Sequence, residues 1–111
     1  MINKIDEIYN YLKENKCKDI SVYNSISDNN LNDIVVVISH SNIAKNKEFA
    51  EKFMKDVDLD IYPEGFYKGE WIVFDFNDIV IHSFVSSVRE KYNLDKLYKT
   101  KKVTIEKQNK K

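Results

Sequence analysis

Polar residues with catalytic potential follow two neighbouring segments of the chain. Residues 39–42 (Ser-His-Ser-Asn) come after an apolar run and lead into a helical pattern, and Asp58 and Asp60 come after that helix. A polar turn at the start of a helix can hold phosphate groups, and an Asp-x-Asp pair can hold two divalent metal ions. Together these features indicate metal-dependent phosphate chemistry as one hypothesis.

Nucleotidyltransferases build such a site with a glycine in the helix-start turn, whereas this chain has His40 there. A Cβ at this position makes close approach of the backbone to a phosphate less favourable. Asp58 and Asp60 share one face of a predicted strand, where exposure to solvent explains both carboxylates. We therefore expect no enzymatic activity, and a metal-dependent nucleotidyltransferase using Asp58 and Asp60 stays as the alternative.

Histidine, cysteine and glycine are too sparse for a recognisable metal or phosphate motif. His40 and His82 are the two histidines, and the single cysteine, Cys17, has no partner for an intrachain disulfide. Gly65 and Gly69 are the two glycines, and neither opens a predicted helix as a glycine-rich phosphate loop would. We expect no metal, no cofactor and a partly buried Cys17 thiol.

The formal net charge of zero is the sum of two unlike parts. Residues 99–111 carry six Lys and one Glu, a surplus of five, so residues 1–98 are net negative by five. The segment from Asp56 to Asp78 contains seven carboxylates and one Lys, and a segment of this charge repels nucleic acid. An acidic surface favours encounter with a basic protein. The Lys-rich tail could touch RNA phosphates, but such tails are more often solvated and disordered.

Length and hydropathy indicate one domain outside the membrane. A chain of 111 residues with 42% apolar residues buries one core, and its apolar runs are far shorter than the roughly 18 residues that span a bilayer. The N-terminal residues include Asp6 and Glu7 and lack the basic start of a signal peptide. We expect a cytoplasmic protein with a domain over residues 1–98 and a basic, disordered tail over 99–111.

Apolar periodicity defines the first elements. It predicts a helix over residues 4–15, with Asn3 as its cap, and a strand over 19–23. A polar loop over 24–32 leads to residues 34–38, which are β-branched throughout. A run of that kind, without polar alternation, favours a central strand covered on both faces.

A second helix is expected to begin at Ser41 or Asn42, either of which can cap it. Its apolar stripe, which should pack on the sheet, consists of Phe49, Ala50, Phe53, Met54 and Val57. Residues 58–62 are predicted to form a short strand. An irregular connection is expected over 63–69, where Pro63, Gly65 and Gly69 occur.

Residues 71–76 and 79–84 are predicted to form a hairpin, because Asn77-Asp78 tolerates the positive φ angles of a two-residue turn. One face of this hairpin, expected to be core, consists of Ile72, Phe74, Phe76, Ile79 and Ile81. The other, which we call the mixed face, consists of Trp71, Val73, Asp75, Val80, His82 and Phe84. The mixed face is either a second core with a polar edge or a recognition surface.

The C-terminal part of the domain is predicted to be helical. Residues 87–90 (Ser-Val-Arg-Glu) fit a capping box that opens a short helix, and Leu94 and Leu97 continue an apolar face to Tyr98. The element order is then αββαβββα. This order indicates an α+β fold of one domain, with a mixed β-sheet covered by helices mainly on one side.

Residues 69–82 (Gly-Glu-Trp-Ile-Val-Phe-Asp-Phe-Asn-Asp-Ile-Val-Ile-His) resemble the signature of the ribosomal silencing factor (Iojap) family. Residues 88–98 are similar to the family's Val-Arg-Glu-x-Tyr-x-Leu-Glu-x-Leu-Trp, with Tyr98 in place of Trp. Upstream, Ile43 and Ala44 stand where an Asp-Arg pair is usual, and His40 replaces the family's glycine. The similarity extends from about Lys18 to Tyr98.

This resemblance implies a nucleotidyltransferase-like topology without catalytic residues. It also implies a translation repressor that binds the large ribosomal subunit through ribosomal protein fourteen and sterically blocks joining of the small subunit. Carried onto this sequence, the partner-binding residues are Trp71, Asp75, Phe76, Asp78 and His82. Trp71 is the leading anchor, and the alternative is that its side chain fills the core.

A self-associating scaffold is a third hypothesis. An uncovered apolar face of the hairpin can pair with a second copy of the chain about a twofold axis. A homodimer off the ribosome is also compatible with the silencing role, because one surface can serve both partners in turn.

Overall fold

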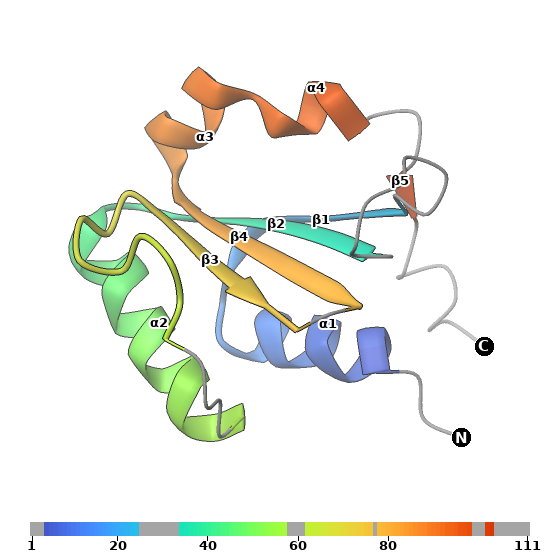
Figure 1. Ribbon diagram of the computed structural model, residues 1–111, viewed down its shortest axis with the longest axis horizontal. Helices are drawn as coiled ribbons and strands as arrows, with labels where there is room; N and C mark the ends of the chain where they lie inside the picture. Colours follow the sequence, from blue (N-terminus) through green and yellow to red (C-terminus); the bar gives the residue numbers. More distant parts are fainter. Residues whose placement is uncertain (1–3, 25–33, 58–61, 77, 99–101, 104–111) are drawn as a thin grey trace.

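The computed structural model describes residues 4–24, 34–57, 62–76, 78–98 and 102–103, and it confirms the predicted α+β class. A single β-sheet lies between two layers of helices (Figure 1). In chain order the elements are α1 (Lys4–Glu14), β1 (Lys18–Asn24), β2 (Ile34–His40), α2 (Ile43–Val57), β3 (Trp71–Asp75), β4 (Ile79–Val85), α3 (Ser86–Tyr92), α4 (Leu94–Tyr98) and β5 (Lys102–Val103). Within these residues, no helix has the length and apolar character needed to cross a bilayer.

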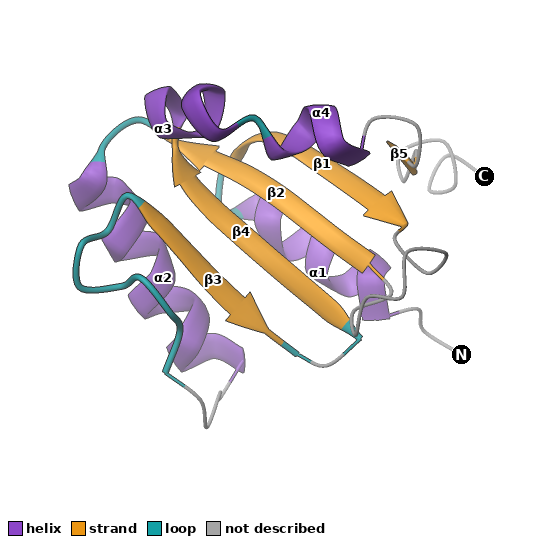
Figure 2. Cartoon of the chain, turned by 45° about the horizontal axis from the view of Figure 1, so that its top comes forward, coloured by secondary structure: helices purple, strands orange, loops and turns teal. Residues whose placement is uncertain are grey.

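The sheet is mixed, as predicted, and its strand order is β3-β4-β2-β1-β5. β2 and β4 run parallel, from Ile34 beside Ile79 to His40 beside Val85, while the other neighbours are antiparallel. The parallel pair brings the C-terminal ends of β2 and β4 together at one edge of the sheet (Figure 2). Side chains from distant parts of the sequence therefore meet at that edge.

Helices cover both faces of the sheet. α1 and α2 lie on one face, over the larger core, and the short α3 and α4 lie on the other, over a smaller one (Figure 1). We expected helices to cover the sheet mainly on one side. The larger core does lie on one side, but α3 and α4 form a second helix layer on the other, which was not expected. Helices of seven and five residues are too short to show a clear apolar period in the sequence.

The first helix and first strand agree with the prediction. Ile5, Tyr9 and Leu12 of α1 are buried at helical spacing, and β1 begins one residue before the predicted start. A bulge in β1 lies between Lys18 and Ser21, where the strand changes register against β2. The predicted cap Asn3 and residues 25–32 of the predicted loop lie outside the described residues.

β2 is the central strand that its β-branched run predicted. Val36 and Ile38 belong to the larger core, whereas Val35 and Val37 belong to the smaller one on the opposite face. Because alternate side chains of a strand point to opposite faces, such a run is buried on both sides. The prediction of a central strand is confirmed.

α2 is capped by Asn42, whose Oδ1 accepts a hydrogen bond from the Lys45 amide at 2.8 Å. Phe49, Ala50 and Phe53 of the predicted stripe are buried, and Met54 packs partly buried against the same core. Val57 is exposed, contrary to the prediction, because it is the last residue of the helix. The stripe therefore ends one helical turn early.

The connection from α2 to β3 is irregular, as predicted. Gly65 has φ 82°, and a Cβ added there would lie 2.1 Å from the Trp71 carbonyl oxygen, so this position requires glycine. Glu64 pairs with Val73 through two backbone hydrogen bonds and so lines the outer side of β3. Of the predicted strand 58–62, Tyr62 is not in a strand, and residues 58–61 lie outside the described residues.

The hairpin of β3 and β4 has the predicted register. Trp71 lies opposite Phe84, and Asp75 lies opposite Val80. The predicted core face joins the larger core, while Trp71 and Val73 pack with Val80 and Phe84 in the smaller core. The expected positive φ is wrong for Asp78, and Asn77 lies outside the described residues.

The predicted capping box at Ser87 is wrong. α3 begins at Ser86, directly after β4, and its N-cap residue is Val85, which makes no side-chain capping hydrogen bond. The strand enters the helix without a turn, so Ser87 lies inside the helix. At the other end Asn93 adopts a left-handed conformation with φ 52°, and its amide donates to the Arg89 carbonyl at 2.8 Å.

Two residues of the predicted tail are strand residues. Lys102 pairs with Tyr23 and Val103 pairs with Val22, which adds β5 to the edge of the sheet beside β1. Residues 99–101 and 104–111 lie outside the described residues.

Candidate functional site

Trp71 occupies the start of β3 on the mixed face and is half-buried. Its indole ring stacks on Phe84 at a centroid distance of 4.8 Å and lies 4.9 Å from the ring of Tyr92 of α3. One side of the indole thus contributes to the smaller core. Trp71 therefore combines the two roles that the sequence left open, because it packs on the core and keeps part of its surface in solvent.

His82 holds the polar edge of this indole. The Trp71 Nε1–H donates to His82 Nδ1 at 2.9 Å, which requires an unprotonated Nδ1 and places the proton of the neutral ring on Nε2. Burial lowers the pKa of His82 from 6.5 to about 4. His82 is thus a neutral hydrogen-bond acceptor that fixes the orientation of Trp71.

An aromatic side chain of the C-terminal helices extends this surface. Tyr92 of α3 is 53% exposed although it contacts Trp71. In Figure 2 no described helix lies in front of β3, and along that strand Trp71 and Val73 are half-buried and Asp75 is exposed. The exposed aromatic edge and β3 form a surface that a partner can cover.

Carboxylates border the mixed face at its far end. Asp75 at the end of β3 and Asp78 at the turn are both exposed, and Glu64 is exposed on the strand-like segment beside Val73. Phe76 does not belong to this surface, because its ring packs against Phe53 of α2 at 5.7 Å, on the other face of the sheet. Of the five predicted site residues, the structure brings Trp71 and His82 into contact, places Asp75 and Asp78 near the turn, and separates Phe76 from them.

Arg89 holds the C-terminal helices on the sheet. Its Nε and Nη2 donate to the two carboxylate oxygens of Asp95, each at 2.8 Å, and its Nη1 donates to the Asp19 carbonyl at 2.6 Å and Ser39 Oγ at 2.8 Å. The Tyr23 hydroxyl also donates to Asp95, at 2.5 Å. The Arg89 hydrogen bonds keep the pKa of Asp95 below its usual range.

No local sequence pattern predicts this Arg89 cluster. Arg89 and Asp95 were recognised as part of a family-like segment, but no spacing rule connects them with Ser39 or with the β1 bulge. The bulge and the left-handed Asp19, at φ 50°, place a backbone carbonyl within reach of the guanidinium. Long-range contacts of this kind arise from strand pairing and leave no local signal.

A second polar cluster lies where β2 meets α2. Asn46 Nδ2 donates to the carbonyls of Gly69 and Ser83, at 2.9 and 3.0 Å, so its Oδ1 is turned toward Ser83 Oγ and His40 Nδ1. All these groups are buried. Asn46 is the residue through which the sequence could have indicated this polar cluster, because it lies on the same buried side of α2 as Phe49 and Phe53.

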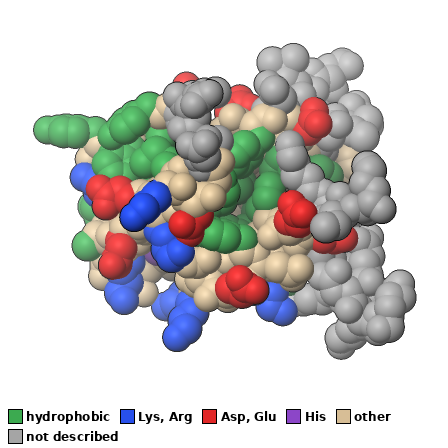
Figure 3. All heavy atoms as spheres, turned by 90° about the horizontal axis from the view of Figure 1, so that it is seen from below, with side chains coloured by type: hydrophobic (Ala, Val, Ile, Leu, Met, Phe, Trp, Pro, Cys, Tyr) green, Lys and Arg blue, Asp and Glu red, His purple; other side chains and the backbone are tan. Residues whose placement is uncertain are grey.

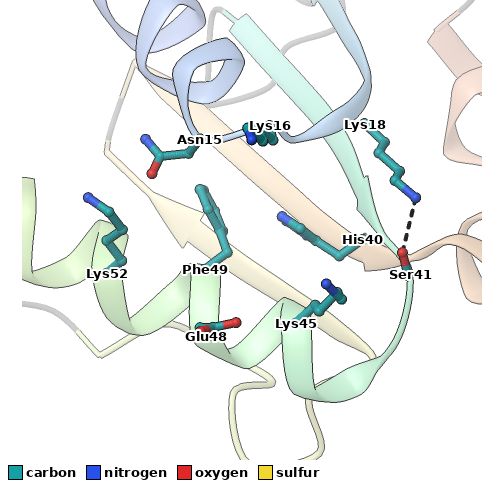
Figure 4. Close-up of a pocket in the computed structure, with 9 residues that line it drawn as sticks. All are labelled: Asn15, Lys16, Lys18, His40, Ser41, Lys45, Glu48, Phe49 and Lys52. Atoms are coloured by element: carbon teal, nitrogen blue, oxygen red, sulfur yellow. Dashed lines mark hydrogen bonds between the residues drawn. The ribbon is translucent and has the colours of Figure 1, made fainter.

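His40, at the end of β2, is one of nine residues that line a pocket of about 420 Å³ (Figure 4). Among the described residues, no three His, Cys, Asp or Glu side chains gather closely enough to hold a metal ion. Asp58 and Asp60, the residues of the nucleotidyltransferase alternative, lie outside the described residues. Cys17 is partly buried as predicted, and burial raises the pKa of its thiol to about 12.

The fold recurs in two solved structures. A protein from Chromobacterium violaceum superimposes with a TM-score of 0.75 at 24% identity, over 94% of this chain and 92% of that one. A protein from Bacillus halodurans superimposes with a TM-score of 0.71 at 22% identity, over 90% of this chain and 95% of that one. At these identities the two matches show a shared fold.

Sequence comparison gives the family. A Chromobacterium violaceum protein named ribosomal silencing factor RsfS is 28% identical over 91 residues, which are 78% of this chain and 75% of that protein. The family profile described as "Ribosomal silencing factor during starvation" matches residues 1–111. Because that match covers the whole sequence and agrees with the signature hairpin, the chain belongs to the ribosomal silencing factor family.

Proposed function

We propose that this protein binds the large ribosomal subunit through the mixed face and blocks joining of the small subunit by occupying that position. The family membership supports a silencing role, and the resemblance of residues 69–98 implies ribosomal protein fourteen as the contact. The place of action is the cytoplasm, where subunits join. This mechanism is steric and needs no catalytic group.

The observation that carries the proposal is the arrangement around Trp71. Its indole is oriented by the hydrogen bond to His82 and supported by Phe84, so little side-chain entropy remains to be lost on binding. Aromatic anchors that are rigid and partly exposed are typical of interface hot spots. Tyr92 beside it supplies further exposed aromatic area.

Charge supports a basic partner. Asp75 and Asp78 stand at one end of β3, and Glu64 borders it. The segment from Asp56 to Asp78 has seven carboxylates and one Lys, so it repels RNA phosphates and attracts Lys and Arg of a ribosomal protein. Such complementarity raises the association rate more than the final affinity.

The test is co-sedimentation of the purified protein with isolated large subunits, followed by addition of small subunits. We expect the protein to pellet with large subunits and to reduce the fraction of joined ribosomes. Trp71→Glu should weaken binding by about a hundredfold, as expected for loss of a hot spot of roughly 3 kcal/mol. Circular dichroism and thermal melting must show that this variant is folded.

Charge reversal provides a second variant that leaves the core intact. Asp75→Lys on the mixed face should slow association, whereas Glu51→Lys, an equal charge change on an exposed position of α2, should leave it unchanged. If wild-type protein neither pellets with large subunits nor affects joining, the proposal is wrong. Equal binding by Asp75→Lys and Glu51→Lys would remove this face from the interface.

Self-association is part of the same proposal. The face that covers the ribosomal partner can cover a second copy when the protein is free, because both occupants bury the same apolar area. Analytical ultracentrifugation should then show a mass that rises with concentration and a dimer that large subunits dissociate. A monomer mass at every concentration would reject the dimer and leave the ribosomal role untouched.

A further inference from the structure

The pocket of about 420 Å³ lies on the opposite face of the sheet from the mixed face, between the end of α1, the start of β1 and the first turns of α2 (Figure 4). Its volume is in the range of small-molecule sites. The residues that line it are Asn15, Lys16, Lys18, His40, Ser41, Lys45, Glu48, Phe49 and Lys52. Four lysines and one glutamate line this hollow; Lys52 is paired with Asp56, and Lys16, Lys18 and Lys45 still outnumber Glu48, although residues 1–98 as a whole are net negative by five.

The lysines belong to two walls of the pocket, one formed by the turn from α1 into β1 and the other by α2. Lys16 and Lys18 flank the turn into β1, and Lys45 and Lys52 lie on the same side of α2 as Glu48 and Phe49, at helical spacing. Figure 3 views the molecule from the side of α1 and α2 and shows Lys and Arg side chains interspersed with Asp and Glu side chains. Lys18 Nζ donates to Ser41 Oγ at 3.0 Å, which links the two walls beside the start of α2.

An unsatisfied nitrogen of His40 is the second observation. His40 is 8% exposed, its ring stacks on Phe49 at 4.9 Å, and it points from the end of β2 into the space that the lysines surround (Figure 4). Its Nε2 is buried and has no hydrogen-bond partner within the part of the chain that the structure describes. Buried nitrogens without a partner are rare, because the lost hydration costs free energy.

The hydrogen bonds around His40 determine which of its ring nitrogens carries the proton when the ring is neutral. Asn46 Oδ1 is an acceptor, since Asn46 Nδ2 is used by two carbonyls, so the His40 Nδ1 at 2.9 Å must carry a proton and donate. In a neutral ring the Nε2 is therefore unprotonated. A proton taken up at Nε2 would turn it into a charged donor directed at whatever occupies the pocket.

We propose that this pocket binds a small phosphate-bearing anion of the diphosphate type, held by Lys16, Lys18 and Lys45 and by the protonated Nε2 of His40. Charge-assisted hydrogen bonds from Lys and imidazolium are the strong contacts that phosphate oxygens accept. The N-terminus of α2, a helix of 15 residues, lies beside the same space and adds a favourable dipole. A metal cation is disfavoured because the four lysines repel it.

Protonation of His40 is linked to binding. Burial is the largest cause that lowers the pKa of His40, the Lys18 charge adds to it, and the hydrogen bond to Asn46 opposes it. The other charged residues that line the space are Lys16, Lys45, Lys52 and Glu48, and Lys52 is paired with Asp56 of the same helix at 2.6 Å. A bound anion offsets the charges of Lys16, Lys18 and Lys45, so anion binding should take up a proton at His40 and strengthen as the pH falls.

The experiment is titration of the full chain with inorganic pyrophosphate at low ionic strength, by calorimetry and by ¹⁵N NMR of the histidine rings. We expect saturable binding, a shift of the His40 Nε2 resonance and no shift at His82. Lys45→Glu should lower the affinity by about tenfold or more, the cost of one charge-assisted contact. Lys96→Glu, an equal charge change on α4 across the sheet, should change it less than about twofold.

Every result of this titration either supports the anion-binding proposal or overturns it. No saturable binding, or equal loss in Lys45→Glu and Lys96→Glu, overturns the proposal. A short single-stranded RNA that binds in a Lys45-dependent way while pyrophosphate does not would assign the pocket to a nucleic-acid contact and also overturn it. If Lys45→Glu is unfolded by circular dichroism, Lys16→Glu on the other wall replaces it. None of these readouts involves ribosomes, so the result is independent of the proposed function.

Discussion

The two faces of the sheet each contain one histidine, and the two rings differ in what their nitrogens contact. On the mixed face His82 accepts a hydrogen bond from Trp71, and the surroundings are aromatic with a carboxylate border. On the other face His40 donates to Asn46 and leaves Nε2 buried among lysines. The same residue type thus orients an anchor in one place and faces a basic pocket in the other.

The difference also concerns how each helix layer is held. α1 and α2 are attached by apolar burial, with Leu12 and Phe53 fully enclosed. Neither α3 nor α4 contains a fully buried residue: Val88, Leu94 and Tyr98 pack partly buried on the smaller core, and the contacts of Arg89 with Asp95 add a charged cluster. The hydrophobic effect dominates the attachment of α1 and α2, whereas α3 and α4 combine partly buried apolar contacts with one charged cluster.

The largest stability effect is expected from breaking that cluster. Arg89→Ala leaves Asp95 partly buried, with 28% of its side chain exposed, and removes every hydrogen bond of the guanidinium. We expect a loss of about 3 kcal/mol in the free energy of unfolding, measured by urea denaturation. Lys91→Ala, an exposed cation in the same helix, should stay within about 0.5 kcal/mol. Equal effects would show that α3 and α4 are held by packing instead.

Acid should weaken the mixed face through His82. Its pKa is about 4 in the folded protein and 6.5 when unperturbed, so between these values the unfolded chain binds more protons. Stability is therefore fully present above about pH 6.5 and is lost as the pH falls toward 4, by at most about 3 kcal/mol. His82→Gln keeps an acceptor for Trp71 and should flatten this dependence in denaturation curves at several pH values. An unchanged pH profile in that variant would contradict the assignment.

A smaller effect is expected from Tyr92, which borders Trp71. Tyr92→Ala should reduce affinity for the large subunit by about five- to tenfold, since it removes exposed aromatic area of about 1 kcal/mol. Tyr62→Ala, an exposed tyrosine before β3, is the matched control and should bind as wild type. The measurement is co-sedimentation over a range of protein concentrations. If the two variants bind equally, the interface does not extend from β3 to α3.

Local patterns predicted much of the fold correctly. The β-branched run of β2, the stripe of Phe49 and Phe53, and the alternation along β3 and β4 each report burial through the side-chain period of one element. The errors fell where elements meet. Ser87 was assigned as a cap because nothing in the sequence shows that β4 runs directly into α3, and Val57 was assigned to the core because the stripe does not show where the sheet ends.

The candidate site was predicted in part. Alternation placed Trp71, Asp75 and His82 on one face, and the register of the hairpin confirmed this. The contact between Trp71 and His82, and the cover that Tyr92 gives, depend on side-chain orientation and on the position of α3. Phe76 was included through the resemblance, and its ring packs on α2.

The sequence by itself determined the α+β class, the burial of β2, the hairpin register and the family, because these follow from periods and motifs within short segments. Tertiary structure alone decided that Arg89 meets Asp95 and the β1 bulge, and that the His40 Nε2, which has no hydrogen-bond partner among the described residues, lies at a pocket lined by lysines. Arg89 reaches Asp19 and Ser39 across 70 and 50 positions of the chain, and Lys18 reaches Ser41 across 23. These contacts depend on the pairing of β2 with both β1 and β4, and a one-dimensional pattern does not record that pairing.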